Sequence, residues 1–166
     1  MKKFLLLAMS STLLASCGFT PMYGDHSVSQ RADVKQAFSQ IEIDNIPDRE
    51  GQFLRNELID RLNLRGHSDS PRYQLSFGGV RTELRELDLT KDSEATRSQL
   101  TATTKMNLID KSNGNVVLTR NLKSISSYNI LQSNFATRVT ESNAEETAIK
   151  DLARQAEQQL ALYFNR

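Results

Sequence analysis

The sequence predicts a single α+β domain in which a four-stranded mixed sheet carries two helices packed on one face, in the order β-α-β-β-β-α. Four stretches alternate apolar with polar residues, which is the period of half-buried strands. Two longer stretches repeat apolar residues every three or four positions, as amphipathic helices do. One sheet with both helices on the same side accounts for these stripes, and it leaves the other sheet face rich in Ser, Thr, Gln and Arg.

The domain is expected over residues 39–166, and its first strand lies at 40–44, where isoleucines alternate with polar residues. A helix is predicted from about 50 to 64, with Asp48 as its N-cap and Gly66 as its C-terminal stop. The strand that follows favours a right-handed crossover and therefore a mixed sheet. The apolar stripe of this helix consists of Phe53, Leu54, Leu58, Ile59 and Leu62.

The second alternating stretch changes phase twice. Residues 72–77 alternate cleanly, Gly78-Gly79 interrupts them, and the apolar positions resume out of step at Val80 and continue to Leu84. They switch back at Leu87. Because a slip by one residue would turn the apolar side chains to the other face, each switch predicts a β-bulge.

The third and fourth strands are expected to form a hairpin. The third carries apolar residues at alternate positions over 100–108, and the fourth follows Asn113-Gly114. This dipeptide is typical of a type I′ turn, whose two central residues need positive φ. Another phase change between Leu122 and Ile125 predicts a further bulge.

The last helix is predicted to begin at a capping box, Ser142-Asn143-Ala144-Glu145. Before it, residues 129–140 are expected to form a polar loop with three apolar side chains, Ile130, Leu131 and Phe135. These three either contact a partner or pack back onto the domain's own core. The stripe of the helix consists of Ala148, Ile149, Leu152, Ala153, Ala156, Leu160, Tyr163 and Phe164.

The N-terminus has the features of a bacterial lipoprotein signal peptide, expected over residues 1–16. Met1-Lys2-Lys3 is a charged start, residues 4–14 form an apolar run too short to span a bilayer, and Leu14-Ala15-Ser16-Cys17 ends it as a processing site. Its cysteine, the only one in the chain, would be acylated and anchor the protein in a membrane. The alternative is an ordinary secreted protein with one stray thiol. Gly18 stands where Asp favours retention in the inner membrane, so we expect the inner leaflet of the outer membrane, on the periplasmic side.

A lipidated arm is expected over residues 17–38, between the anchor and the domain. Phe19, Met22 and Tyr23 cluster around a proline and two glycines, which suits an extended arm pressed onto another surface. Residues 25–36 are polar and suit a flexible tether.

Composition and motifs argue against several classes of function. Loss of Lys2 and Lys3 with the signal peptide reduces the 21 basic residues to 19, against 20 acidic ones, so there is no global basic field for nucleic acid. No Cys/His cluster has metal-ligand spacing, and there is no phosphate-binding loop or nucleophile elbow. We therefore expect a protein that is not an enzyme and that holds no metal or cofactor.

Three features together resemble a known family. They are the run Cys17-Gly18-Phe19-Thr20-Pro21-Met22-Tyr23-Gly24, the segment Gly51-Gln52-Phe53-Leu54-Arg55-Asn56-Glu57-Leu58, and the β-α-β-β-β-α order. The chain resembles the LptE family of lipopolysaccharide-assembly lipoproteins, in a form similar to its alphaproteobacterial members. The resemblance implies that the chain plugs and helps to assemble the LptD β-barrel, and that it binds lipopolysaccharide during transport to the cell surface.

The resemblance also implies residues for each contact. Lipid A carries phosphates, which need cations, and the positions that match the family's basic residues are Lys91 and Arg138, with Arg97 as the substitute for Lys91. Each of these cations is otherwise a solvated surface charge. The residues expected to contact the barrel or another surface are Phe19, Met22, Tyr23, Ile130, Leu131 and Phe135.

Two other classes of function stay open at the level of sequence. One is a generic periplasmic binding lipoprotein for another envelope partner, and the other is an envelope hydrolase that depends on an acidic residue. Co-purification with a very large β-barrel separates the first hypothesis from both.

Overall fold

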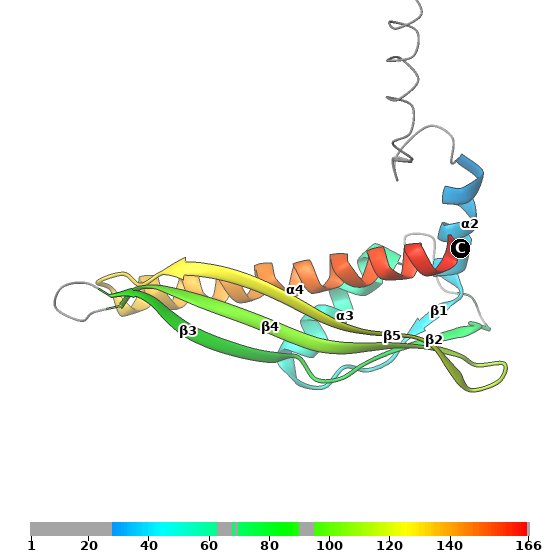
Figure 1. Cartoon of the computed structure of the whole chain (residues 1–166), viewed down its shortest axis with the longest axis horizontal. Coiled ribbons are helices and arrows are strands. Elements are labelled where there is room, and N and C mark those ends of the chain that lie inside the picture. Colours follow the sequence, from blue (N-terminus) through cyan, green and yellow to red (C-terminus); the bar gives the residue numbers. More distant parts are fainter. Residues whose placement is uncertain (1–27, 63–67, 69, 90–94, 166) are drawn as a thin grey trace, which may run out of the picture. The chain divides into compact units, whose positions relative to one another are not determined.

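The computed structural model describes residues 28–62, 68, 70–89 and 95–165 (Figure 1). The chain divides into two compact units, residues 1–31 and residues 32–166. Of the first unit, the structure describes only residues 28–31. The elements are α2 (Val28–Ser39), β1 (Ile41–Ile43), α3 (Asp48–Leu62), β2 (Tyr73–Phe77), β3 (Arg81–Leu89), β4 (Ala95–Asp110), β5 (Asn115–Asn129) and α4 (Asn134–Phe164).

The long strand β4 is the centre of a mixed five-stranded sheet. β5 pairs antiparallel with almost its whole length, while β2 and β3 follow one another along its other edge. The short β1 pairs parallel with β2, as expected from the strand–helix–strand start. The predicted α+β class is confirmed, with five strands and three helices in place of four and two.

The additional strand arises because a bulge divides the predicted second strand. Phe77 lies opposite Met106, whereas Arg81 lies opposite Thr103, so four steps on one strand match three on the other. The predicted bulge at Gly78-Gly79 is therefore confirmed. It reverses which face each residue of β3 presents, relative to a continued β2.

The two other predicted bulges are wrong. The register is unbroken from Leu84 to Leu87 in β3 and from Leu122 to Ile125 in β5. Leu84 and Ile125 are simply exposed, at 54% and 53%, and single exposed apolar residues are common on protein surfaces. The register shift in the hairpin lies instead between Leu108 and Ile109 of β4, near the start of β5.

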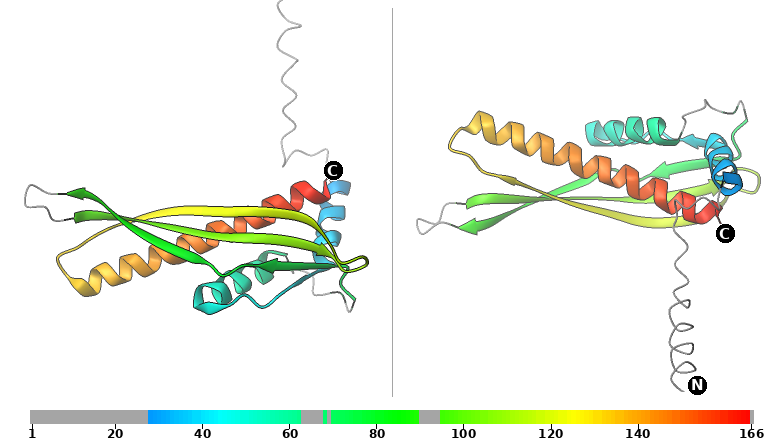
Figure 2. Two further views of the ribbon diagram at one scale, coloured as in Figure 1. Left: turned by 60° about the horizontal axis from the view of Figure 1, so that its bottom comes forward. Right: turned by 90° about the horizontal axis from the view of Figure 1, so that it is seen from above.

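The core fills the space between one face of the sheet and the helices. α4 runs along this face (Figure 2), and α3 packs beside it. Directly opposed residues share a face, so the buried even-numbered positions of β4 and β5 define the inner face and the odd-numbered ones the outer face. The outer face is polar, as predicted. The largest fully buried side chains are Ile41, Ile46, Leu54, Leu58, Leu75, Met106, Leu108, Leu152 and Leu160.

The helix boundaries differ from the prediction at the start of α4. Ser133 is the N-cap, and its side chain accepts a hydrogen bond from the backbone N–H of Ala136 at 3.4 Å. The predicted capping box over 142–145 lies inside the helix, and residues 134–140 are helical rather than a loop. The sequence hides this extension because the first buried residue of α4 is Ala144, so no apolar stripe marks the earlier turns.

α3 begins and ends two residues earlier than predicted. Asp48 is its first residue and has a φ of 66°, and Gly66 lies outside the described residues.

The structure also gives α2 where a tether was predicted. Residues 28–38 of the segment expected to be a flexible tether are helical. Phe38 is buried, Val34 packs against the core, and the Phe38 and Phe164 rings meet edge to face with centroids 6.4 Å apart. The C-terminal end of this segment therefore contacts the far end of the chain. None of the described helices is long and apolar enough to cross a membrane.

The β4–β5 hairpin forms where the sequence predicts it, with a different turn. Residues 111–114 make a four-residue loop between the paired Asp110 and Asn115, and Gly114 has a φ of 70°. Asn113 has no positive φ, so the type I′ prediction is wrong. The Asp110 carboxylate accepts hydrogen bonds from the Ser112 hydroxyl and N–H at 2.6 and 2.9 Å, which fix the loop.

Asp110 also receives a guanidinium. The Arg72 side chain donates to the Asp110 carboxylate at 2.9 Å. The hydrogen bonds from Ser112, followed by that from Arg72, lower the pKa of Asp110 to about 2. This carboxylate therefore ties the hairpin to the strand that follows α3.

Candidate functional site

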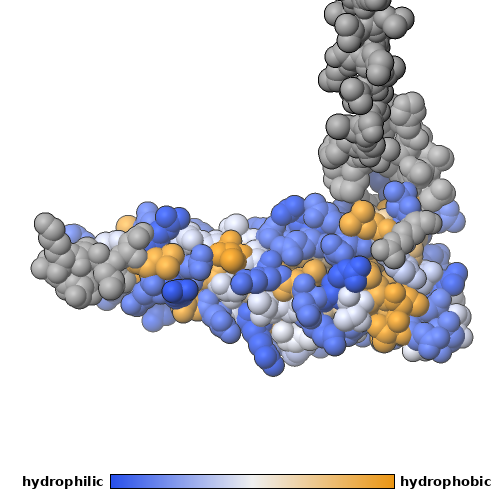
Figure 3. Space-filling view, in the orientation of Figure 1, coloured by the Kyte–Doolittle hydropathy of each residue, from blue (hydrophilic) through white to orange (hydrophobic). Residues whose placement is uncertain are grey.

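Exposed apolar side chains gather where the sheet meets the start of α4. We call Leu131, Phe135 and Val139 the tip cluster; they are exposed at 44%, 79% and 44%. Phe135 and Val139 are four residues apart and so share one side of the first turns of α4. Figure 3 shows apolar groups between charged ones near this end of the domain. An exposed patch of this kind commonly marks a contact surface.

Local hydrogen bonds hold the tip cluster in place. The Thr137 hydroxyl accepts from the N–H of Leu131 at 2.9 Å and lies 3.1 Å from its carbonyl oxygen, to which it donates. The Thr140 hydroxyl contacts the carbonyl oxygens of Asn129 and Thr137 at 3.3 and 2.8 Å. The connection from β5 to α4 is therefore fixed, and Leu131 and Phe135 do not pack into the core.

Ile130 is less exposed than the other two apolar residues of this segment, Leu131 and Phe135. It is half-buried, and its N–H donates to the carbonyl oxygen of Thr96 at 3.0 Å. Of the three apolar residues predicted in this segment, Leu131 and Phe135 are thus available to a partner, and Ile130 is partly covered by the domain itself.

Two of the predicted phosphate ligands lie at this same end. Arg97 is exposed on the outer sheet face opposite Asn129, and Arg138 is exposed on α4 between the two helical residues of the tip cluster. Neither forms an ion pair with another residue in the described part of the chain. The residues outside the described part of the chain are Cys17, Phe19, Met22, Tyr23 and Lys91.

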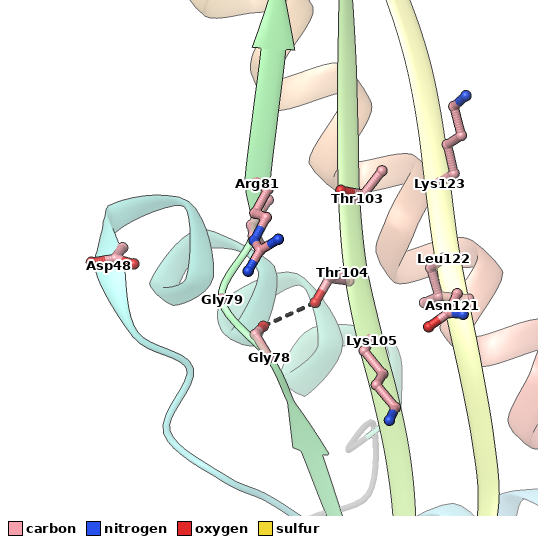
Figure 4. A pocket seen from close by; sticks show the side chains of 11 residues that line it. Asp48, Gly78, Gly79, Arg81, Thr103, Thr104, Lys105, Asn121, Leu122 and Lys123 are labelled. Carbon is pink, nitrogen blue, oxygen red and sulfur yellow. Dashed lines mark hydrogen bonds between the residues drawn. The ribbon is translucent and has the colours of Figure 1, made fainter.

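A second feature, which the sequence did not reveal, is a hollow beside the β2–β3 bulge. We call it the outer-face pocket; it has a volume of about 680 Å³ (Figure 4). Its lining includes three cations, one from each of β3, β4 and β5, namely Arg81, Lys105 and Lys123. Thr103 and Asn121 lie between them.

Backbone hydrogen bonds shape this pocket at the bulge. The N–H of Gly78 donates to the carbonyl oxygen of Lys105 at 2.9 Å, and the Thr104 hydroxyl donates to the carbonyl oxygen of Gly78 at 2.9 Å. On the far side of the bulge lies Asp48, whose carboxylate is the nearest group to the Cβ position of Gly79, at 3.7 Å. Sequence reading missed the cations because their common face depends on the bulge and the register.

The described residues contain no group of three or more His, Cys, Asp and Glu side chains that could hold a metal ion. The tip cluster presents an apolar surface, and the outer-face pocket is lined by three cations.

Several solved structures of bacterial lipoproteins have the same fold as this chain. A lipoprotein of Caulobacter crescentus superposes with a TM-score of 0.64 at 24% identity, covering 81% of this chain and 97% of its own. A minor lipoprotein of Acinetobacter baumannii gives 0.57 at 22% identity, covering 74% and 89%. The rare lipoprotein B of Shewanella oneidensis gives 0.58 at 13% identity, covering 74% and 92%. No curated protein matches the sequence.

The fold of this chain is thus the one found in these bacterial lipoproteins. Residues 38–163 match the family model described as LptE, lipopolysaccharide-assembly. This chain belongs to the LptE family, whose members are assembly lipoproteins rather than enzymes.

Proposed function

We propose that this protein is an outer-membrane lipoprotein that plugs and helps to assemble the LptD β-barrel, and that it binds lipopolysaccharide on its way to the cell surface. The observation that carries the proposal is the tip cluster. Its apolar side chains are held outward by a capped helix, in a chain that belongs to the LptE family. They would contact the barrel.

The polar outer face supports a position inside a barrel. The lumen of a large outer-membrane barrel is polar, and the odd-numbered residues of β4 that face outward include Thr101, Thr103, Lys105 and Asn107. A polar sheet face can lie against such a wall because its polar groups find polar partners there. The apolar contacts would then be made mainly by the tip cluster and by the lipidated arm with Phe19, Met22 and Tyr23.

Acylation at Cys17 would hold the domain at the periplasmic side of the outer membrane. Two or three acyl chains anchor a protein almost irreversibly, and a tether raises the effective concentration of the domain near a barrel in the same membrane. Phe19, Met22 and Tyr23 would extend the contact from the anchor. Failure of radiolabelled palmitate to label the protein, or normal processing of a Cys17→Ala form, would contradict the anchor.

Lipopolysaccharide binding would use the cations near the tip. Arg97 and Arg138 are exposed and form no ion pair among the described residues. The proposal adds Lys91, which lies outside the described residues. Guanidinium groups suit the phosphates of lipid A because they donate two parallel hydrogen bonds. The protein itself carries out no chemical step.

The experiment replaces exposed apolar residues and measures how much of the barrel co-purifies with each variant from outer membranes. A double variant, Leu131→Ser with Phe135→Ser, should co-purify with the barrel at least about tenfold less than the wild type, because buried interface aromatics often contribute 2 kcal/mol or more, as a rough guide. The matched control is Leu162→Ser, which removes an exposed leucine of α4 far along the chain from the tip cluster. All variants should keep the wild-type melting temperature.

Unchanged co-purification of the tip variant would refute the barrel contact. Retention of a different envelope protein, with no large β-barrel in the purified material, would favour the generic binding lipoprotein instead.

A further inference from the structure

The bulge between β2 and β3 determines the charge of the outer sheet face. In β2 the odd-numbered residues Leu75 and Phe77 point into the core. Without the extra residue of the bulge, Arg81 would also point to the inner face. The register instead places Arg81 opposite Thr103, on the outer face, and Lys123 pairs with Thr103 from the other side.

The three cations of the outer-face pocket therefore surround a small polar floor. Lys105 lies opposite Asn121, two residues along β4 from the row of Arg81, Thr103 and Lys123. Neighbouring strands are about 4.8 Å apart and residues on one face repeat every ~7 Å along a strand. The three cations therefore project from backbone positions within roughly 10 Å of one another, around Thr103 and Asn121.

The side chains around this floor are exposed and free to adjust. Figure 4 shows the Arg81 guanidinium beside its own strand β3, while Lys105 and Lys123 extend in opposite directions along their strands. None of the three forms an ion pair with a residue that the structure describes. Closing around an anion would therefore require rotation of the two lysine side chains and no rupture of an existing ion pair.

Charge is also segregated over a larger area. The outer-face positions of the paired parts of β3, β4 and β5 include five cations, Arg81, Arg85, Arg97, Lys105 and Lys123, and one carboxylate, Glu83. The whole chain carries a formal charge of only +1. Asp48, the acidic residue of the pocket, lies across the glycine bulge from the lysines (Figure 4).

We propose that the outer-face pocket binds a phosphate group, held by Arg81, Lys105 and Lys123 above Thr103 and Asn121. Hydroxyl and amide donors beside several cations suit a compact oxyanion, because charge-assisted hydrogen bonds are the strong ones. The volume of about 680 Å³ is typical of small-molecule sites, so the phosphate has room for a head group or a sugar attached to it. This site is separate from the tip cluster, and it lies on the sheet face that the proposed function sets against the barrel wall, so a phosphate bound here would lie between the two.

The test uses the purified, acylated full chain in a neutral detergent, with amide NMR signals as the readout. Inorganic phosphate is the first probe, and vesicles of phosphatidylcholine with and without phosphatidic acid are the second. The variant is Arg81→Gln with Lys105→Gln and Lys123→Gln. The control is Arg85→Gln, which removes one exposed cation from the same face of β3 without touching the pocket.

We expect phosphate to shift the signals of Thr103 and Asn121, and the triple variant to bind about tenfold or more weakly, as expected for the loss of three exposed charges. Arg85→Gln should stay within about twofold, and all variants should keep the wild-type melting temperature because the changed side chains are exposed. A response to phosphatidic acid vesicles alone, with the same pattern of variants, would also support the site and identify a lipid head group as the source of the phosphate.

Two results would overturn the proposal. One is a phosphate response that Arg85→Gln weakens as much as the triple variant does. The other is no response to either probe while the triple variant loses a protein partner, which would make this face a docking surface for acidic protein. The barrel contact of the tip cluster is tested with other variants, so failure of one proposal leaves the other standing.

Discussion

Gly51 of α3 lies where the helix approaches the preceding loop most closely. A Cβ at this position would lie 2.7 Å from Cγ2 of Ile46 and 3.0 and 3.1 Å from its carbonyl carbon and oxygen. Ile46 is fully buried, and its carbonyl accepts a hydrogen bond of 2.6 Å from the Gln52 side chain. The loop therefore cannot retreat without cost when Gly51 is replaced by Ala.

The expected magnitude follows from two opposing effects. Overpacking a well-filled core costs about 1–3 kcal/mol, whereas Ala is preferred over Gly in a helix by about 1 kcal/mol. We expect Gly51→Ala to lower the free energy of unfolding by about 1 kcal/mol, which corresponds to a decrease in melting temperature of about 4 °C for a domain of this size.

A double-mutant cycle with Ile46→Ala isolates the clash. In the Ile46→Ala background the Cγ2 atom is gone while the backbone contacts at 3.0 and 3.1 Å remain, so Gly51→Ala should cost less than it does in the wild type, with a coupling energy of about 1 kcal/mol. Urea unfolding of the four proteins, followed by circular dichroism, measures both effects. If Gly51→Ala stabilises the wild-type background as much as the variant background, the close approach of α3 to Ile46 is refuted.

Three further predictions concern the sheet and its hairpin. Leu108→Ala should cost about 2–5 kcal/mol in urea unfolding, whereas Ile125→Ala, exposed on the outer face, should stay within about 0.5 kcal/mol; equal effects would contradict the assignment of faces. Because its pKa is lowered, ionised Asp110 stabilises the fold at pH values above its ordinary pKa of 3.8. This contribution is lost as the pH falls through about 2, so the urea midpoints of the wild type and Asp110→Asn should converge over that range. Gly114→Ala should cost about 1 kcal/mol because of its positive φ, with Gly78→Ala as the milder control, and similar melting temperatures would argue against the turn geometry.

The parts of the fold that follow from local periodicity were predicted from the sequence. The stripe of Leu54, Leu58 and Leu62, the bulge at Gly78-Gly79 and the position of the hairpin all depend on residues close together in the chain. The parts that depend on distant contacts were not. α2 forms where Phe38 meets Phe164, and no local pattern predicts that contact.

The tip cluster was partly predictable, because Leu131 and Phe135 are apolar residues among polar ones. Their exposure was not predictable, since it depends on the cap at Ser133 and on the helical turns that follow. The outer-face pocket could not be predicted, because Arg81 reaches the outer face only through the register that the bulge creates.

The central claim is that this lipoprotein inserts its exposed tip into a lipopolysaccharide-exporting β-barrel. The most direct measurement places a photoactivatable cross-linking amino acid at position 135, irradiates intact cells and identifies the adduct in the outer membrane by mass spectrometry. We expect a single major adduct with a very large β-barrel protein, lost when the same group is placed at exposed position 162 instead. A protein that remains uncross-linked at position 135, or that is recovered free in the periplasm without a barrel, would contradict the claim.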